Sequence, residues 1–235
     1  MVLISLIAPL YLAALVALVS ALLIGLFLPE PPPRPTPPGV KKLHFADTRI
    51  RPFLIVSFFT SYVMATVHQV GGFYFQDKLH LTAAQTARDV GLALALMAIV
   101  SMGSQFLIIR PFNVTPKVLM RLGAPTILSG VAVLIASSTL IPLLVGMVLV
   151  GLGLGFAQPG NAAAASLKVH PYEQGGLAGI SMSAASMGFG LGPLLGAALY
   201  HFAPEVPFFV ALAMMIGITA YVFWLSIPDP NDYRG

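Results

Sequence analysis

The sequence predicts an all-α polytopic membrane protein with seven transmembrane helices, the last six of which form one bundle. Of its 235 residues, 57% are hydrophobic and only 9% are charged, whereas a soluble domain carries about 25% charge. The apolar residues gather in windows of about 20, the length of helix that crosses roughly 30 Å of hydrocarbon. Barrel strands would be about half as long and would alternate in polarity, so a β-barrel is excluded.

Seven apolar windows follow one another, each bounded by charge or proline. They cover residues 2–28, 53–75, 90–109, 118–138, 142–167, 176–200 and 207–227. Pro52 and Pro207 stand at expected helix starts, where a missing N–H costs nothing. Three residues separate the fourth window from the fifth, so we expect a tight turn at Pro142.

The first window is interpreted as a true span and not as a secretory signal. It has no positively charged start, it is too long, and no small-residue cleavage site precedes Pro29. A segment rich in proline and then in basic residues follows it. The expected organisation is a transmembrane helix at 1–28, a linker at 29–51, a six-helix bundle at 52–228 and a tail at 229–235.

The basic residues fall almost entirely in alternate loops. One side of the membrane has only Lys78 and Arg88. The other side has Arg34, Lys41, Lys42, Arg49, Arg51, Arg110, Lys117, Arg121, Lys168 and Arg234. Because cytoplasmic loops carry the excess of Lys and Arg, the linker and the C-terminus are expected in the cytoplasm. This sorting explains the net charge of +4 without a nucleic-acid partner.

Polar side chains inside apolar spans are costly, so each is a candidate for function. At 100° per residue, the second span carries a polar arc and an apolar side. The arc contains Ser57, Ser61, Ala65, His68, Gln69 and Gly72, and the opposite side contains Val56, Phe59, Val63, Val67 and Val70. We expect the arc to face a cavity and the valine side to face lipid.

The expected substrate and proton pathway combines polar residues of three spans. Its candidates are Ser61, His68, Gln69, Gln105, Gln158 and Asn161. An imidazole with an ordinary pKa near 6.5 can carry a proton through a transport cycle. The alternative for His68 is a hydrogen bond to a neighbouring helix, and Gln158 and Asn161 can instead satisfy the backbone groups that Pro159 frees.

The sequence contains no arrangement of residues that is typical of an enzyme active site. None of the eight acidic residues falls in the middle of a span, and no spacing fits a metal site, a phosphate loop or a catalytic triad. We therefore expect no enzyme activity, no metal and no cofactor.

Two glycine stripes mark places where helices can approach closely. Gly188, Gly192 and Gly196 repeat every four residues around Pro193. Gly151 and Gly155 precede Pro159 in the fifth span. Each stripe serves either as helix packing or as a hinge at the proline.

The same residues carry a resemblance to a known family. Drug:proton exporters of the tetracycline-resistance type have three features that occur here in the same order. These are a glycine-rich helix that ends near a proline (Gly151, Gly153, Gly155 and Pro159), a Glu-Gln-Gly loop (residues 173–175) and a Gly-Pro-Leu-Leu segment (residues 192–195). Residues 188–197 also fit the exporter pattern G-x-x-x-G-P-x-x-G-G, with Ala197 in place of the last glycine. The chain thus resembles helices six to twelve of a major facilitator superfamily transporter.

The resemblance implies alternating access, in which the six-helix bundle rocks against an N-terminal six-helix half that this sequence lacks. The first span would then be the last helix of that half. The implied activity is proton-coupled efflux of a small amphipathic drug or toxin across the plasma (inner) membrane, with the substrate, protons and the lipid bilayer as partners. Alternatives are a carrier of a sugar, an organic acid or another metabolite, and a self-standing seven-helix protein without transport activity or an inactive truncated product.

The resemblance has one departure. The superfamily's cytoplasmic G-x-x-x-D-R-x-G-R-R loop is expected in the preceding half, and the loop between Arg110 and Arg121 has no acid.

Overall fold

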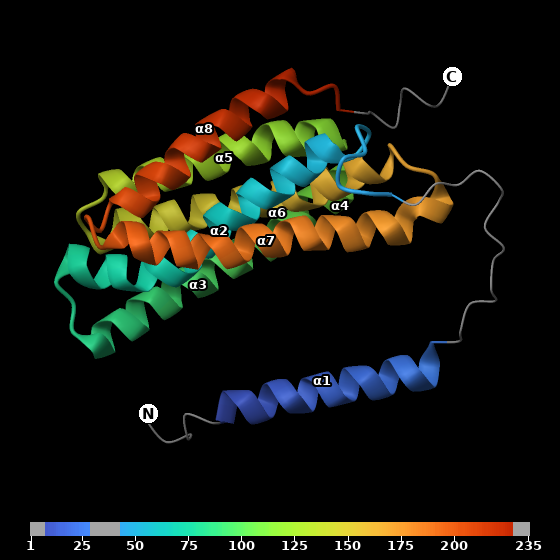
Figure 1. The fold of residues 1–235 in the computed structure, drawn as a ribbon. Coiled ribbons are helices and arrows are strands. Elements are labelled where there is room, and N and C mark those ends of the chain that lie inside the picture. Colours follow the sequence, from blue (N-terminus) through green and yellow to red (C-terminus); the bar gives the residue numbers. More distant parts are fainter. Residues whose placement is uncertain (1–7, 29–42, 228–235) are drawn as a thin grey trace. The chain divides into compact units, whose positions relative to one another are not determined.

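The computed structural model describes residues 8–28 and 43–227, with side chains from residue 11 onward, and the described part is entirely helical apart from its turns (Figure 1). The chain divides into two compact units, Met1–Gly39 and Val40–Gly235. The first unit contains α1, Ala8–Phe27, whose sequence is wholly uncharged. Residues 1–7, most of the predicted linker and the tail from residue 228 lie outside the described residues.

The second unit contains six helices that are long and apolar enough to cross a membrane. The all-α membrane fold is therefore confirmed, with α1 as a further, shorter apolar helix. The helices of this unit are α2 (Arg51–Leu79), α3 (Ala83–Ser104) continuing through a π-helical turn (Gln105–Ile109) into α4 (Arg110–Phe112), α5 (Pro116–Ala136), α6 (Leu140–Ser166), α7 (Gln174–Tyr200) after a 3-10 turn (Pro171–Glu173), and α8 (Val206–Trp224).

Helix ends follow local chemistry. Proline is the first residue of α5 and the second residue of α2 and α8, where its missing N–H breaks no hydrogen bond within the helix. Thr82 and Gln85 form a reciprocal capping box at the start of α3. At the end of α2, His80 adopts a left-handed conformation with φ of 51°, one turn beyond the predicted end at Phe75.

The turn between the fourth and fifth spans lies earlier than predicted. Residue 136 ends α5 and Leu140 begins α6, so Pro142 stands in the first turn of α6. A proline is tolerated there because the first N–H groups of a helix have no partner within it. The expected turn at Pro142 was therefore wrong by about one helical turn.

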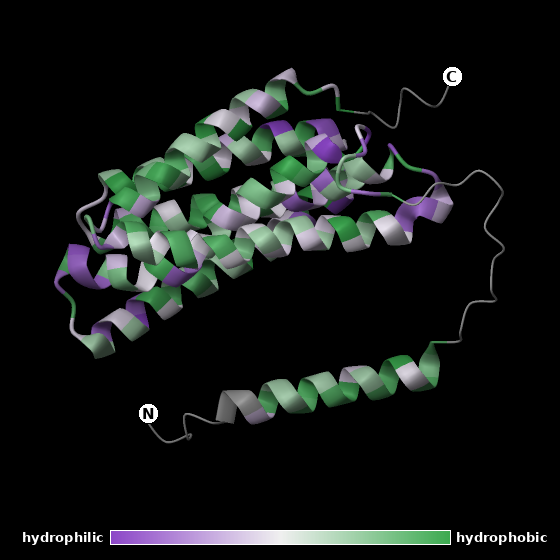
Figure 2. Cartoon of the chain, in the orientation of Figure 1, coloured by the Kyte–Doolittle hydropathy of each residue, from purple (hydrophilic) through white to green (hydrophobic). Residues whose placement is uncertain are grey.

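Within the second unit, α2 and α6 are the most buried helices. The α5 helix packs most extensively on α6, α2 on α7, and α3 on α6, while α8 contacts both α5 and α2. Large side chains fill the core between them, including Phe53, Tyr62, Tyr74, Phe75, Met120, Met147, Phe208 and Met215. Figure 2 shows the most hydrophilic residues near the ends of these helices, as a membrane requires.

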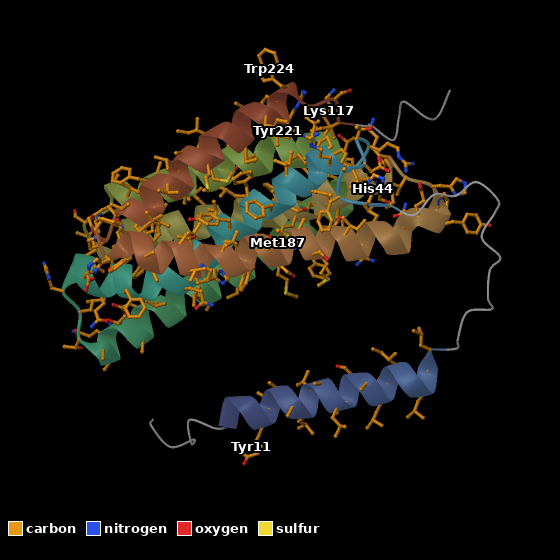
Figure 3. All side chains as sticks on the ribbon, viewed as in Figure 1. Tyr11, His44, Lys117, Met187, Tyr221 and Trp224 are labelled. Atoms are coloured by element: carbon orange, nitrogen blue, oxygen red, sulfur yellow. The ribbon has the colours of Figure 1, made fainter. Side chains whose placement is uncertain are left out.

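The valine side of α2 does not face lipid, contrary to the expectation. Val56, Val63, Val67 and Val70 are all at most 4% exposed and belong to the core of the bundle. The reason is position, because α2 is surrounded by α7, α8, α6 and α3. Exposed apolar side chains lie instead on α3, α7 and α8; Trp224 at the end of α8 is 90% exposed and points away from the bundle (Figure 3).

Candidate functional site

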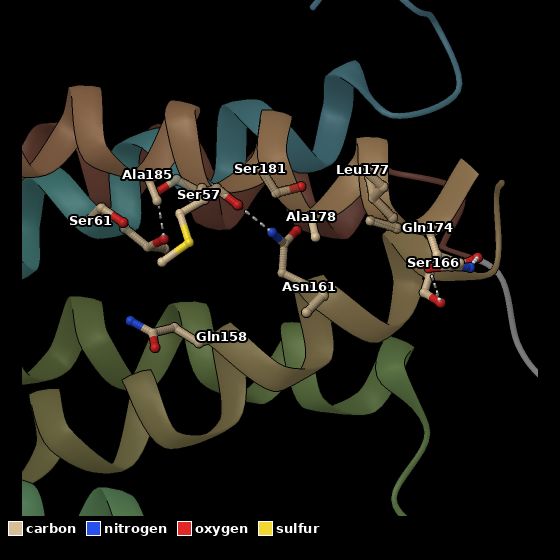
Figure 4. Close-up of a pocket in the computed structure, with 14 residues that line it drawn as sticks. Ser57, Ser61, Gln158, Asn161, Ser166, Gln174, Leu177, Ala178, Ser181 and Ala185 are labelled. Atoms are coloured by element: carbon tan, nitrogen blue, oxygen red, sulfur yellow. Dashed lines mark hydrogen bonds between the residues drawn. The ribbon is translucent and has the colours of Figure 1, made fainter. Parts of the chain in front are cut away.

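A cavity of about 460 Å³ lies between α2, α6 and α7 (Figure 4). We call it the Asn161 cavity. More than half of its lining residues carry a hydroxyl or an amide, and none is ionisable. The residues are Ser57, Thr60, Ser61, Gln158, Asn161, Ala162, Ala165, Ser166, Gln174, Leu177, Ala178, Ser181, Met182 and Ala185.

Asn161 fixes the geometry of this cavity. Its Nδ2 donates to the carbonyl oxygen of Phe53 at 3.0 Å and to the Oγ of Ser57 at 2.8 Å, which joins α6 to α2. Its Oδ1 is buried and has no hydrogen-bond partner among the described residues. An unpaired buried acceptor costs about 1–3 kcal/mol, so a donor that reached this oxygen would stabilise the site.

Ser166 and Gln174 bind each other where α6 ends and α7 begins. The Oγ of Ser166 is 3.1 Å from the Oε1 of Gln174, and the Nε2 of Gln174 donates to the carbonyl oxygen of Ser166 at 3.0 Å. Both side chains line the Asn161 cavity. This amide is therefore already engaged in linking α6 to α7, unlike the free oxygen of Asn161.

A second cavity of about 400 Å³ lies between α2, α3 and α6. We call it the His68 cavity. Its lining residues are Met64, His68, Leu94, Met97, Ala98, Ser101, Met102, Gln105, Leu154 and Gln158. Gln158 lines both cavities, and its Nε2 lies 3.6 Å from the sulfur of Met64 on α2.

The two cavities together present hydrogen-bonding groups with almost no charge. His68 is the one ionisable residue among those that line them. Moving an unpaired charge from water into such surroundings is expensive, whereas a neutral solute can exchange its bonds with water for bonds to hydroxyls and amides. The lining is therefore suited to an uncharged solute.

Five of the six residues expected in the pathway line these cavities. Ser61, Gln158 and Asn161 line the Asn161 cavity, and His68 and Gln105 line the His68 cavity. Gln69 is exposed and lines neither.

Sequence reasoning expected Ser57 to face a cavity as part of the polar arc, but it did not select Thr60, Ser166, Gln174 and Ser181, which also line the Asn161 cavity. The spacing of Gln174 and Ser181, seven residues apart on α7, is a signal that could have found two of them.

The glycine stripes lie at helix contacts beside the cavities. A Cβ atom at Gly188 would meet the carbonyl oxygen of Phe58, and one at Gly192 would lie 2.8 Å from the carbonyl oxygen of Tyr62, both on α2. A Cβ at Gly196 would lie 2.7 Å from a methyl group of Val70. These glycines allow the backbones of α7 and α2 to approach closely.

On α6, Gly151 and Gly155 have the same relation to α3. A Cβ at Gly151 would lie 2.5 Å from the carbonyl oxygen of Met97, and one at Gly155 would lie 2.7 Å from that of Ser101. Pro159 lies in α6 after Gly155, and Pro193 lies in α7 directly after Gly192. The close approach places Met97 and Ser101 at the wall of the His68 cavity.

The sequence was compared with models of known protein families, and one family model matches. The model of the Major Facilitator Superfamily matches residues 116–235, from the start of α5 onward. No curated protein matches the chain.

Proposed function

Because the chain belongs to the Major Facilitator Superfamily and thus to a family of membrane transporters of small molecules, we propose that it exports an uncharged amphipathic drug or toxin in exchange for protons. The observation that carries the proposal is the pair of adjoining cavities that share Gln158. They combine hydroxyls and amides with methionine side chains. Such a lining can hold both ends of an amphipathic compound.

The proposed mechanism is alternating access around these cavities. The bundle of α2–α8 rocks against a second six-helix bundle, α1 is the last helix of that bundle, and residues 29–51 join the two. Residues 29–51 and the C-terminus lie on the cytoplasmic side of the plasma (inner) membrane. In this arrangement His68, the ionisable residue of the cavity lining, carries the proton.

The size of the native product tests the two-bundle part of the proposal. A tag at the C-terminus, introduced at the native locus, should report a product about twice as large as this chain, with its N-terminal peptide identified by mass spectrometry. A native start at Met1 would instead require that a separate chain supplies the second bundle.

Transport itself is tested in inside-out membrane vesicles that contain the native product. Radiolabelled chloramphenicol, an uncharged amphipathic antibiotic, should accumulate when the lumen is more acidic than the medium, and a protonophore should abolish the accumulation. Gln158→Ala should lower the initial rate at least tenfold, because this residue lines both cavities.

Gln76→Ala is the matched control for this variant. Gln76 is also a glutamine of a membrane helix, but it lines neither cavity. It should leave the rate per molecule of protein unchanged. If both variants reduce the rate only in proportion to their abundance, the cavities do not bind the transported compound.

The lining of the Asn161 cavity also favours a second candidate, a carrier of an uncharged hydroxylated metabolite such as a sugar. Serine, threonine, asparagine and glutamine provide most of its polar atoms, and the Oδ1 of Asn161 has no hydrogen-bond partner among the described residues. An organic acid is disfavoured because no lysine or arginine lines the cavity. Counterflow of labelled glucose without a proton gradient, together with no chloramphenicol uptake, would select this candidate.

A further inference from the structure

The wall of the His68 cavity contains an unusual concentration of sulfur. Three of its ten lining residues are methionines, Met64 on α2 and Met97 and Met102 on α3. The whole chain has ten methionines among 235 residues. His68 lies one helical turn after Met64, so its imidazole and that thioether share one face of α2.

The packing holds part of this group in place. Met97 is 4% exposed, and its backbone lies against Gly151 of α6. The sulfur of Met64 is 3.6 Å from the Nε2 of Gln158. Met102, by contrast, is 62% exposed. The group therefore has a fixed side, formed by α2, α3 and α6, and an accessible side.

The imidazole of His68 is free to accept a further partner. It forms no hydrogen bond with any residue of the described part of the chain, although it lies in the bundle and not in a loop. The cavity lining also contains no carboxylate, and the chain has no cysteine. All donors of the lining are therefore neutral: thioether sulfur, imidazole nitrogen, and the hydroxyl and amide groups of Ser101, Gln105 and Gln158. Of these, the thioethers and the imidazole are the donors that suit copper.

This donor set selects a particular class of metal. Thioethers are soft ligands that favour Cu(I), whereas Mg²⁺, Ca²⁺ and Mn²⁺ favour carboxylate, carbonyl and water oxygen. Structural zinc sites need thiolate, imidazole or carboxylate donors in larger number than one imidazole supplies. We propose that Met64, His68 and Met97 form a binding site for a monovalent soft metal ion, Cu(I) or Ag(I).

The site does not depend on what the chain transports, because it is defined by binding. Ag(I) is the practical probe, since it has the ligand preference of Cu(I) and needs no reductant. Purified full-length protein, titrated with silver nitrate in chloride-free buffer, should bind one Ag(I) more tightly than any others. Binding should also raise the midpoint of thermal unfolding, because the ion binds the folded state.

Variants of similar volume test the ligands without opening a cavity. Met64→Leu combined with Met97→Leu should lower the Ag(I) affinity at least tenfold and reduce the thermal shift accordingly, and His68→Gln should lower the affinity by a similar factor. Leucine replaces methionine in apolar surroundings at small cost. Met182→Leu, in the Asn161 cavity, is the matched control and should leave the Ag(I) affinity unchanged.

X-ray absorption at the silver edge identifies the ligands directly. The wild-type sample with one equivalent should show sulfur and nitrogen neighbours, and the double variant should lose the sulfur signal. The proposal is overturned if wild-type protein and the double variant bind Ag(I) equally, or if the wild-type spectrum contains no sulfur neighbour. Either result is independent of whether chloramphenicol or glucose is transported.

Discussion

His68 shows how much depends on one side chain in this membrane bundle. Among the residues that line the two cavities it is the one able to gain or lose a proton near neutral pH. We expect His68→Gln to lower proton-driven uptake at least tenfold while exchange of labelled for unlabelled substrate, which needs no net proton movement, continues. His201→Gln, which changes an exposed imidazole just after α7, should leave both activities intact.

These two rates are measured in the same vesicles, with and without an imposed pH gradient. Equal loss of both in His68→Gln would assign the residue to substrate binding or packing. Unchanged rates in both assays would remove His68 from the proton pathway altogether.

Single polar residues were largely predictable from the sequence, but their partners were not. Asn161 and Gln158 could be selected because an amide in an apolar span is costly unless it has a use. The neighbours that bond Asn161, Ser57 and the carbonyl of Phe53, are more than 100 positions away in the chain. Gln69 shows the limit of the argument, since the helical arc that contains His68 is wider than the cavity.

At the scale of the element, the α7 helix provides a test of close packing with an internal control. Gly188→Ala places a Cβ against the carbonyl oxygen of Phe58, so the backbones of α2 and α7 must separate, at a cost of about 1–3 kcal/mol. Gly190→Ala on the same helix meets nothing within 4 Å, and it should be neutral or stabilising by up to about 1 kcal/mol.

The measurement is the midpoint of thermal unfolding of the purified protein in detergent. Gly188→Ala should lower it and Gly190→Ala should not. A drop of similar size in both variants would mean that flexibility of the α7 backbone, and not its contact with α2, is what these glycines provide.

The existence and length of the helices were predictable, whereas their faces were not. Hydrophobic length is a strong signal because the membrane sets it. In lipid, however, both a neighbouring helix and an acyl chain are apolar, so a row of valines does not tell which of the two it contacts. This is why Val63 and Val67 of α2, expected in lipid, are found in the core.

In the whole molecule, the helices from α2 to α8 form two closely packed groups with the cavities between them. The α2 helix pairs with α7, and both α3 and α5 pack on α6. The Asn161 cavity is bounded by α2, α7 and α6, and the His68 cavity by α2, α3 and α6. Asn161 and Gln158 are two of the side chains that bond across to α2, and Tyr74 of α2 bonds to the carbonyl oxygen of Leu134 at the end of α5.

The pairing of α2 with α7 is tied at both ends. At one end, the guanidinium of Arg49 donates to both oxygens of Glu173 at 3.0 Å and to Asp47 at 2.9 Å. At the other end, the hydroxyl of Tyr200 donates to Asp77 at 2.5 Å. The side-chain hydrogen bonds from Arg49, followed by the bond from its backbone N–H, hold the pKa of Asp47 below its usual value of 3.8.

A pH dependence of stability follows from this lowered pKa. A carboxyl whose pKa is lower in the folded state stabilises it above the unfolded value, and the contribution is lost as the pH falls through the folded value. Asp47→Asn should therefore lower the thermal unfolding midpoint at pH 7, and the difference from wild type should shrink below about pH 4. A difference that stays constant down to pH 3 would show that the charge of Asp47 is not its cause.

The partnership of α2 and α7 also has a consequence for the order of synthesis. Their end contacts join residues 123 and 124 positions apart, so a ribosome making this chain delivers α2 long before its partner exists. During that interval the face of α2 that later meets Gly188, Gly192 and Gly196 must be covered by lipid, by the insertion machinery or by a temporary neighbour. The Asn161 cavity forms only after α7 has been synthesised and packed against α2, so the protein becomes able to bind a ligand there late in its synthesis.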